Sequence, residues 1–136
     1  MLRPTLDEVM GNVIASFDDI IKPDITDPYA ASIALTLSNL LRHARVRAQL
    51  EPEVLWDDNR DLRGVLAELG LTAPAALPAD AYPSLTLLID EAVALRTALD
   101  AYVREHPGDA RVLAYFGRQL ERQRPWMVEA WEGPRR

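Results

Sequence analysis

Apolar residues recur at helical spacing along almost the whole chain, and this pattern restricts the fold more than any other feature. The clearest case lies between positions 85 and 102, where the apolar series is Leu85, Leu88, Ala92, Leu95, Leu99 and Tyr102. Alternating steps of three and four place these side chains along one side of a helix, as in a bundle seam. No segment shows sustained apolar–polar alternation between turn signals, which a strand would require. The sequence therefore predicts an all-α protein.

Local start and stop signals divide the chain into five predicted helices. Thr5 and Glu8 have the spacing of a capping box, and Asp27-Pro28 combines an N-cap with a proline at the first helical position. Pro52 is expected to interrupt the next helix. We expect helices at about 5–22, 28–50, 53–69, 84–105 and 109–131, with a loop over 71–83. The 136 residues suit one domain, 1–136, built as a four- to five-helix antiparallel up-and-down bundle.

Apolar stripes also predict which side of each helix faces the core. In the first helix the stripe is Leu6, Val9, Met10, Val13, Phe17, Ile20 and Ile21. In the second it is Ala30, Ile33, Ala34, Leu37, Leu40, Leu41, Ala44 and Ala48. In the last it is Val112, Leu113, Phe116 and Leu120.

The helix over 84–105 is apolar around so much of its surface that it is either the central helix or packs on a second subunit. The tail around Trp126 and Trp131 is equally suited to covering a bundle end or to binding a partner. We therefore expect self-association or a protein partner, with candidate interface residues Leu85, Leu88, Leu95, Leu99, Trp126 and Trp131. A homodimer would use a two-fold interface.

Composition excludes several function classes. The formal net charge of −6 and the pI near 4.9 argue against nucleic-acid binding, which needs a basic face. No apolar run approaches the roughly 18–20 residues of a membrane span, and the start of the chain lacks a signal-peptide pattern. A cytoplasmic location is the expectation. The absence of cysteine excludes disulfides, thiolate-ligated metals and a thiol nucleophile.

A polar stripe on the second helix is the main candidate for ligand binding. Ser32, Thr36, Asn39 and His43 fall within about 60° of one another on a helical wheel. Such a line of hydroxyl, amide and imidazole groups suits the wall of a ligand cleft. It equally suits a solvated helix face, since it lies well away from the centre of the apolar stripe. The sequence leaves both interpretations open.

Arg42 and Arg45 lie one turn apart beside this stripe and can converge on an anion such as phosphate or carboxylate. Cations near the end of a helix also complement its dipole, which explains them without a ligand. The Glu-x-x-His pattern of di-metal bundles is missing, because Leu40 precedes His43 by three positions. A site combining His43 with carboxylates of three helices stays open, but we assign no metal, cofactor or catalytic residue.

Short motifs add a resemblance to a known group of proteins. The residues Arg3-Pro4-Thr5, Ile21-Lys22-Pro23, Leu40-Leu41-Arg42 and Arg124-Pro125-Trp126 resemble those of small helical bacterial proteins of no assigned function. Members of that group are encoded near acyl-CoA dehydrogenase-like and phosphotransferase-like genes. The resemblance implies a mostly helical fold and an accessory role in acyl-CoA or steroid-type catabolism, and it carries over no catalytic residue.

Taken together, the residues favour a non-enzymatic accessory or interaction protein that works through helix-face contacts. The lack of a recognisable catalytic constellation supports this hypothesis, since neither a Gly-x-Ser-x-Gly motif nor a glycine-rich phosphate loop occurs. The alternative is a bundle, or an enzyme, that binds a small anionic ligand in a pocket near His43.

Overall fold

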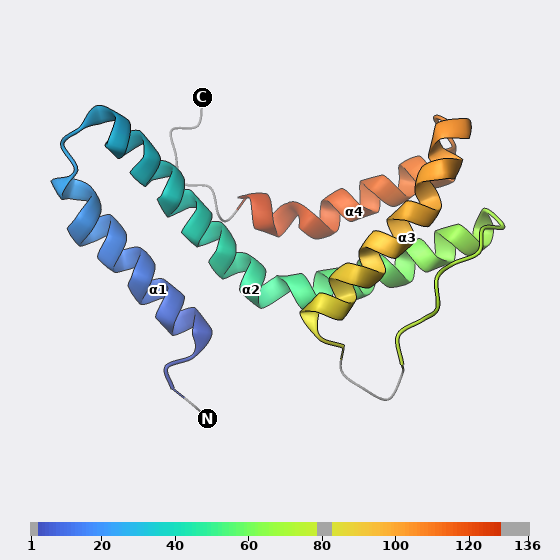
Figure 1. Ribbon diagram of the computed structural model, residues 1–136, viewed down its shortest axis with the longest axis horizontal. Helices are drawn as coiled ribbons and strands as arrows, with labels where there is room; N and C mark the ends of the chain where they lie inside the picture. Colours follow the sequence, from blue (N-terminus) through green and yellow to red (C-terminus); the bar gives the residue numbers. More distant parts are fainter. Residues whose placement is uncertain (1–2, 79–82, 129–136) are drawn as a thin grey trace. The chain divides into compact units, whose positions relative to one another are not determined.

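The computed structural model describes residues 3–78 and 83–128 (Figure 1). Helix α1 spans Leu6–Ser16 and continues through a π-helical turn, Phe17–Ile21, and a 3-10 turn, Lys22–Asp24. The other helices are α2, Pro28–Glu68, α3, Leu85–Glu105, and α4, Ala110–Val128. The described ranges contain no strand. The protein is thus an all-α helical bundle, as the sequence predicts, with four α-helices in place of five.

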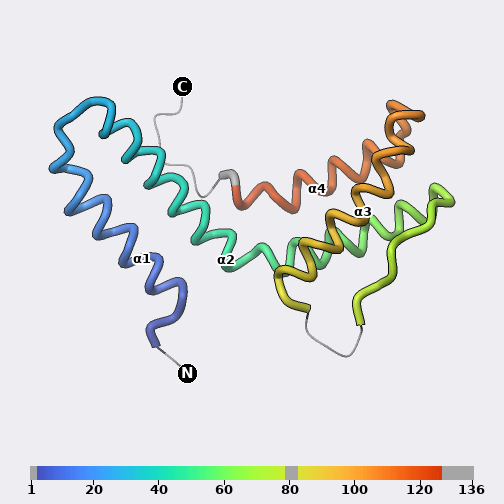
Figure 2. Tube along the Cα trace, in the orientation of Figure 1, coloured from blue at the N-terminus to red at the C-terminus, as the bar shows by residue number. Residues whose placement is uncertain are grey.

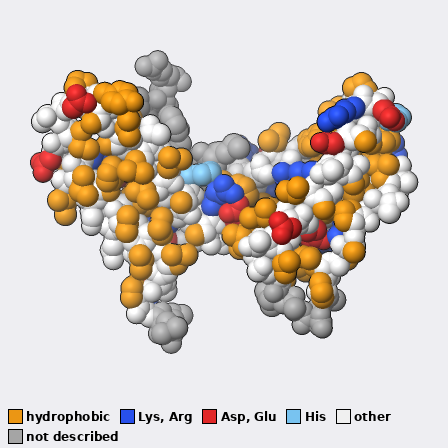
Figure 3. Space-filling view, in the orientation of Figure 1, with side chains coloured by type: hydrophobic (Ala, Val, Ile, Leu, Met, Phe, Trp, Pro, Cys, Tyr) orange, Lys and Arg blue, Asp and Glu red, His pale blue; other side chains and the backbone are white. Residues whose placement is uncertain are grey.

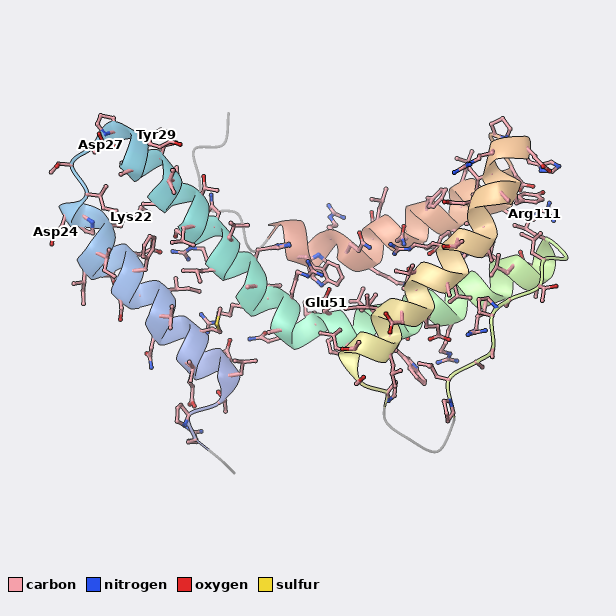
Figure 4. All side chains as sticks on the ribbon, viewed as in Figure 1. Lys22, Asp24, Asp27, Tyr29, Glu51 and Arg111 are labelled. Carbon is pink, nitrogen blue, oxygen red and sulfur yellow. The ribbon has the colours of Figure 1, made fainter. Side chains whose placement is uncertain are left out.

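The helix starts follow the sequence signals. Thr5 Oγ1 accepts from the backbone N–H of Glu8 at 3.2 Å, and Glu8 Oε2 accepts from the N–H of Thr5 at 2.7 Å, which completes the capping box. Asp27, which Figure 4 labels, caps α2 by accepting from the N–H of Ala30 at 2.8 Å. These contacts satisfy N–H groups that have no partner within the helix.

Helix α2 corrects the expectation that Pro52 separates two helices, since it runs unbroken for 41 residues. Pro52 lacks an N–H and its ring crowds the carbonyl of Ala48, at a typical cost of about 3 kcal/mol inside a helix. Good helix formers on both sides of Pro52, among them Ala48 and Leu55, favour the continuation of the helix. The helix ends at Glu68, and Gly70 in the following turn has a φ of 71°, which allows Leu71 N–H to reach the carbonyl of Leu66 at 2.8 Å.

The chain divides into two compact units, which a sequence-based expectation of one domain does not foresee. The hairpin unit contains the described residues up to Leu50 together with those from Arg124 onward, and the three-helix unit is Glu51–Gln123. Because α2 contributes to both units, no loop or linker marks the division in the sequence.

The core of the three-helix unit joins the second part of α2 to α3 and α4. It consists of Leu62, Val65, Leu66, Leu95, Leu99, Val112 and Tyr115. The a/d positions of α3 supply Leu88 and Ala92 as further buried residues, whereas Leu85 is exposed. Helix α3 is therefore the central packing helix of this unit, the first of the two alternatives that its sequence allows.

The sequence predicts the wrong buried face for α4, since three of the four residues expected to point inward are exposed. Val112 is buried as expected, but Leu113, Phe116 and Leu120 are 58%, 38% and 60% exposed. The side turned toward α2 instead carries Tyr115, Gln119 and Arg122, which all donate to Asp58. Asp58 is buried, and a buried carboxylate needs such donors.

Residues 71–78 form no regular secondary structure, in agreement with the predicted loop. Arg63 holds this segment on the three-helix unit by donating to the carbonyls of Pro74 at 2.6 Å and Ala75 at 3.0 Å. The same guanidinium pairs with Glu91 of α3. At another place in this unit, Arg111 donates to the carbonyl of Glu68 at 3.1 Å (Figure 4). Within the described ranges, no helix is long and apolar enough to cross a membrane.

Candidate interaction face of the hairpin unit

In the hairpin unit, α1 and the first part of α2 run side by side in opposite directions (Figure 2). Asp7 near the start of α1 pairs with Arg45, and Asp18 near its end pairs with Arg42. We call the contact between the two helices the seam. Charged side chains at both ends therefore fix its antiparallel register.

Asp18 shows how polar the seam is. Its Oδ1 accepts from Ser38 Oγ at 2.7 Å and from Lys22 Nζ at 3.4 Å, and its Oδ2 accepts from Arg42. The hydrogen bond from Ser38 and the pairing with Arg42 and Lys22 lower the pKa of Asp18 below its ordinary 3.8, although burial acts in the opposite direction. The carboxylate is thus ionised and fully engaged within the chain.

Asp7 receives a two-pronged contact from Arg45, whose Nε and Nη2 donate at 2.6 and 2.8 Å. This geometry lowers the pKa of Asp7 and raises that of Arg45. Gly11 lies next to the same guanidinium, because a Cβ at this position would be 3.4 Å from it. The seam residues on α1 are therefore mostly polar or small, and Ile14 is the only α1 side chain in the described chain that is buried.

The apolar stripes of both helices point away from the seam. At about 100° per residue, Ile33, Leu37 and Leu40 lie roughly 100–160° around α2 from Ser38. The stripe of Leu6, Val9 and Val13 is rotated from Asp7 and Asp18 by a similar angle and in the same sense. Since the two helices are antiparallel, equal rotations carry both stripes to one side of the hairpin.

We call this side the apolar face. Its large side chains are 40–67% exposed and comprise Leu6, Val9, Val13, Ile20, Ile33, Leu37 and Leu40. Hydrophobic side chains gather over α1 and the first part of α2 in the space-filling view (Figure 3). The sequence correctly identifies these residues as apolar stripes but assigns them to a core. Only the pairing of Asp7 and Asp18 with α2 reveals that the stripes face outward.

The polar stripe of Ser32, Thr36, Asn39 and His43 lies on the other side of α2. Ser32 and Thr36 are exposed, and Thr36 Oγ1 donates to the carbonyl of Ser32 at 3.2 Å. His43 is half-buried, and its Nδ1 lies 2.9 Å from the carbonyl oxygen of Trp126. A carbonyl oxygen can only accept, so Nδ1 carries the proton. The Ser32 end of the stripe is thus exposed to solvent, whereas Trp126 covers the His43 end.

Trp126 is the buried centre of this second side. Arg47 lies over its ring, 5.2 Å from the ring centroid, as a cation–π contact. The indole Nε1 of Trp126 and the Oδ1 of Asn39 are buried and have no hydrogen-bond partner among the described residues. Arg42 and Arg45, predicted to grip an anion beside the stripe, are turned to the seam. The two arginines proposed to bind an anion are therefore separated from His43.

The interface residues predicted on α3 need a correction. Leu88, Leu95 and Leu99 are at most 2% exposed in the core of the three-helix unit, so they are not accessible to a second subunit. Leu85 remains exposed, Trp126 is buried in the hairpin unit, and Trp131 lies outside the described residues.

In the part of the chain that the structure describes, no three His, Asp or Glu side chains form a group suited to a metal ion. Comparison of the chain with family models, curated proteins and solved structures gave no match.

Proposed function

We propose that this protein is a non-enzymatic interaction protein that docks through the apolar face of its hairpin unit. The observation that supports this is the concentration of seven large, substantially exposed hydrophobic residues on one side of two adjacent helices. Scattered exposed hydrophobics are normal, but a contiguous patch of this kind is typical of an interaction surface.

The distribution of charge supports the same proposal. Asp7 and Asp18 are engaged with Arg45 and Arg42 in the seam, so the apolar face carries none of these charges. Interface centres are depleted of charged residues in the same way. A partner covering this face would remove apolar area from water without stripping unpaired ions of their hydration.

The biological setting proposed here follows from the resemblance to small helical bacterial proteins. It is an accessory role in acyl-CoA or steroid-type catabolism, performed in the cytoplasm. The partner would then be a protein, and the contribution of this chain would be binding, not chemistry.

Site-specific photo-crosslinking tests the proposed function. A photoreactive amino acid replaces Leu40 on the apolar face or the exposed Ser32 on the polar stripe, and the protein is irradiated in its native extract. We expect discrete protein adducts from position 40, and far fewer from position 32, because only the apolar face is covered. Equal labelling from both positions, or no adduct from position 40, would contradict the proposal.

A second candidate function is small-ligand binding beside His43. It is favoured by the buried Asn39 Oδ1 and Trp126 Nε1, an acceptor and a donor that lack partners among the described residues. Thermal-shift measurements with acyl-CoAs, phosphorylated metabolites and divalent metals test it. A shift abolished by His43→Ala but retained in His106→Ala would support this candidate, and the absence of any shift would exclude these ligand classes.

A further inference from the structure

We infer that the apolar face is covered by a second copy of this chain, so that two hairpin units form a four-helix bundle. The inference rests on the proposed function and specifies the partner. The hairpin unit buries few side chains by itself. Among its described residues, only Ile14, Ala34, Ser38 and Trp126 are buried. Helices must bury their apolar stripe against another element, and one pair of helices offers none.

The spacing on the apolar face matches what a second pair of helices needs. Leu6, Val9 and Val13 follow steps of three and four, while Ile33, Leu37, Leu40 and Ala44 follow steps of four, three and four. Such heptad-like stripes pack with knobs-into-holes geometry in four-helix bundles. One antiparallel hairpin presents two stripes, which is half of such a bundle.

The chemistry of the face suits an identical partner. Its large side chains are aliphatic, so a two-fold axis that sets the face against itself matches apolar with apolar everywhere. Residues 1–50 contain six acidic and five basic side chains, so two copies of this segment carry almost no net charge to repel one another. The −6 charge of the chain comes largely from the remaining residues. A strongly charged partner would find no complementary group on this face.

The size of the face is also sufficient. Its seven large residues together expose on the order of 600 Å² per copy, so two copies would bury about 1,200 Å², the lower end of the standard range of protein interfaces. Two exposed alanines of α2, Ala44 and Ala48, extend the area further.

Sedimentation velocity or light scattering on the full chain gives the first test. We expect a mass of twice 15.2 kDa at micromolar concentrations. Leu40→Glu should raise the dimer dissociation constant at least about 100-fold, because the dimer would bury an unpaired carboxylate. The matched control is Leu120→Glu in the three-helix unit, where the native residue is 60% exposed against 59% for Leu40. It should change the dissociation constant less than about threefold.

Cysteine crosslinking keeps the inference testable if Leu40→Glu fails to fold. The chain has no cysteine, so any disulfide in a single-cysteine variant must join two copies. Val13→Cys, Leu37→Cys and Leu40→Cys lie near the middle of the apolar face, where a two-fold axis brings equivalent positions together. We expect a disulfide-linked dimer from at least one of them under mild oxidation, and none from Ser32→Cys, an exposed position on the polar stripe.

The results separate this inference from the proposed function. A monomeric wild-type chain without crosslinks at any of the three positions overturns the second copy as partner. If photo-crosslinking from position 40 then yields adducts with a different protein, the proposed function stands and only the identity of the partner is wrong. If position 40 yields no adducts either, both fail.

Discussion

Tyr115 on α4 donates its phenolic hydrogen to Oδ2 of Asp58 on α2 over 3.0 Å, with both side chains buried in the three-helix unit. Burial and the neighbouring carboxylate raise the pKa of Tyr115, so the phenol remains the donor. Gln119 at 2.9 Å and Arg122 at 3.0 Å supply further donors to the same carboxylate. Asp58 therefore organises the contact between α2 and α4.

We expect Asp58→Ala to lower the free energy of unfolding by about 3–5 kcal/mol, because it removes an acceptor shared by three side chains of α4 and leaves the buried hydroxyl of Tyr115 without its acceptor. Tyr115→Phe should cost only about 1–2 kcal/mol, since it removes one hydrogen bond and keeps the packed ring. Urea unfolding followed by circular dichroism measures both. Equal losses for the two variants would show that the network does not depend on Asp58.

Acidification should destabilise the hairpin unit. The pKa of Asp18 lies below its ordinary 3.8 when folded, mainly through Ser38 and Arg42, so the folded state binds this proton more weakly than the unfolded state does. The stabilisation is therefore complete above about pH 4 and is lost as the pH falls through the lowered folded pKa. The pKa of Asp7 in the hairpin unit is also lowered, and so is that of Asp61 in the three-helix unit.

Thermal unfolding between pH 7 and pH 2 measures this effect. The thermal midpoint of the wild type should decrease as the pH drops below about 4. Asp18→Asn should have a lower thermal midpoint at pH 7, and its midpoint should change less on acidification. Asp19→Asn serves as the control, because this neighbouring carboxylate is exposed on α1's π-helical continuation. An identical acid profile for Asp18→Asn and wild type would refute the assignment.

Gly11 offers a test of the seam geometry. Gly11→Ala should stabilise the protein by about 0.5–1 kcal/mol through helix propensity, since the new Cβ would lie in ordinary contact with the Arg45 guanidinium. Gly11→Leu should instead destabilise it by displacing Arg45 from Asp7. Gly117 in α4 has nothing within 4 Å of its Cβ position, so Gly117→Leu should lack this penalty. Thermal or urea unfolding distinguishes these outcomes.

Arg63 is predicted to hold the segment after α2 in place. Arg63→Lys loses the planar fork that reaches Glu91 and the carbonyls of Pro74 and Ala75 together. We expect faster hydrogen exchange in residues 71–78 and a stability loss of about 1–2 kcal/mol. Arg60→Lys, at an exposed position one turn away, should leave exchange in that segment unchanged. Mass spectrometry of exchanged peptides provides the measurement.

Much of the secondary structure follows from local signals. The capping box at Thr5, the N-cap at Asp27 and the left-handed Gly70 each act within a few residues, so the sequence shows them directly. The a/d series in α3 is equally local, because a helix of regular pitch brings Leu88, Leu95 and Leu99 to one side. The continuation of α2 through Pro52 was not predictable in this way, since it depends on the balance between one lost hydrogen bond and the packing of many turns.

The sequence by itself determined that this chain is all helical, where most helices begin, and which residues form apolar stripes. Only the tertiary structure decided which stripes are covered. Burial of Asp58 turns Tyr115, Gln119 and Arg122 inward on α4, and the pairing of Asp7 and Asp18 with α2 turns the hairpin's apolar stripes outward. For α4 the physical reason is that the buried carboxylate of Asp58 costs more without its donors than an aliphatic side chain costs when exposed. Polar pairing between distant residues therefore sets the rotation of α4 and of the two hairpin helices, and local sequence does not contain it.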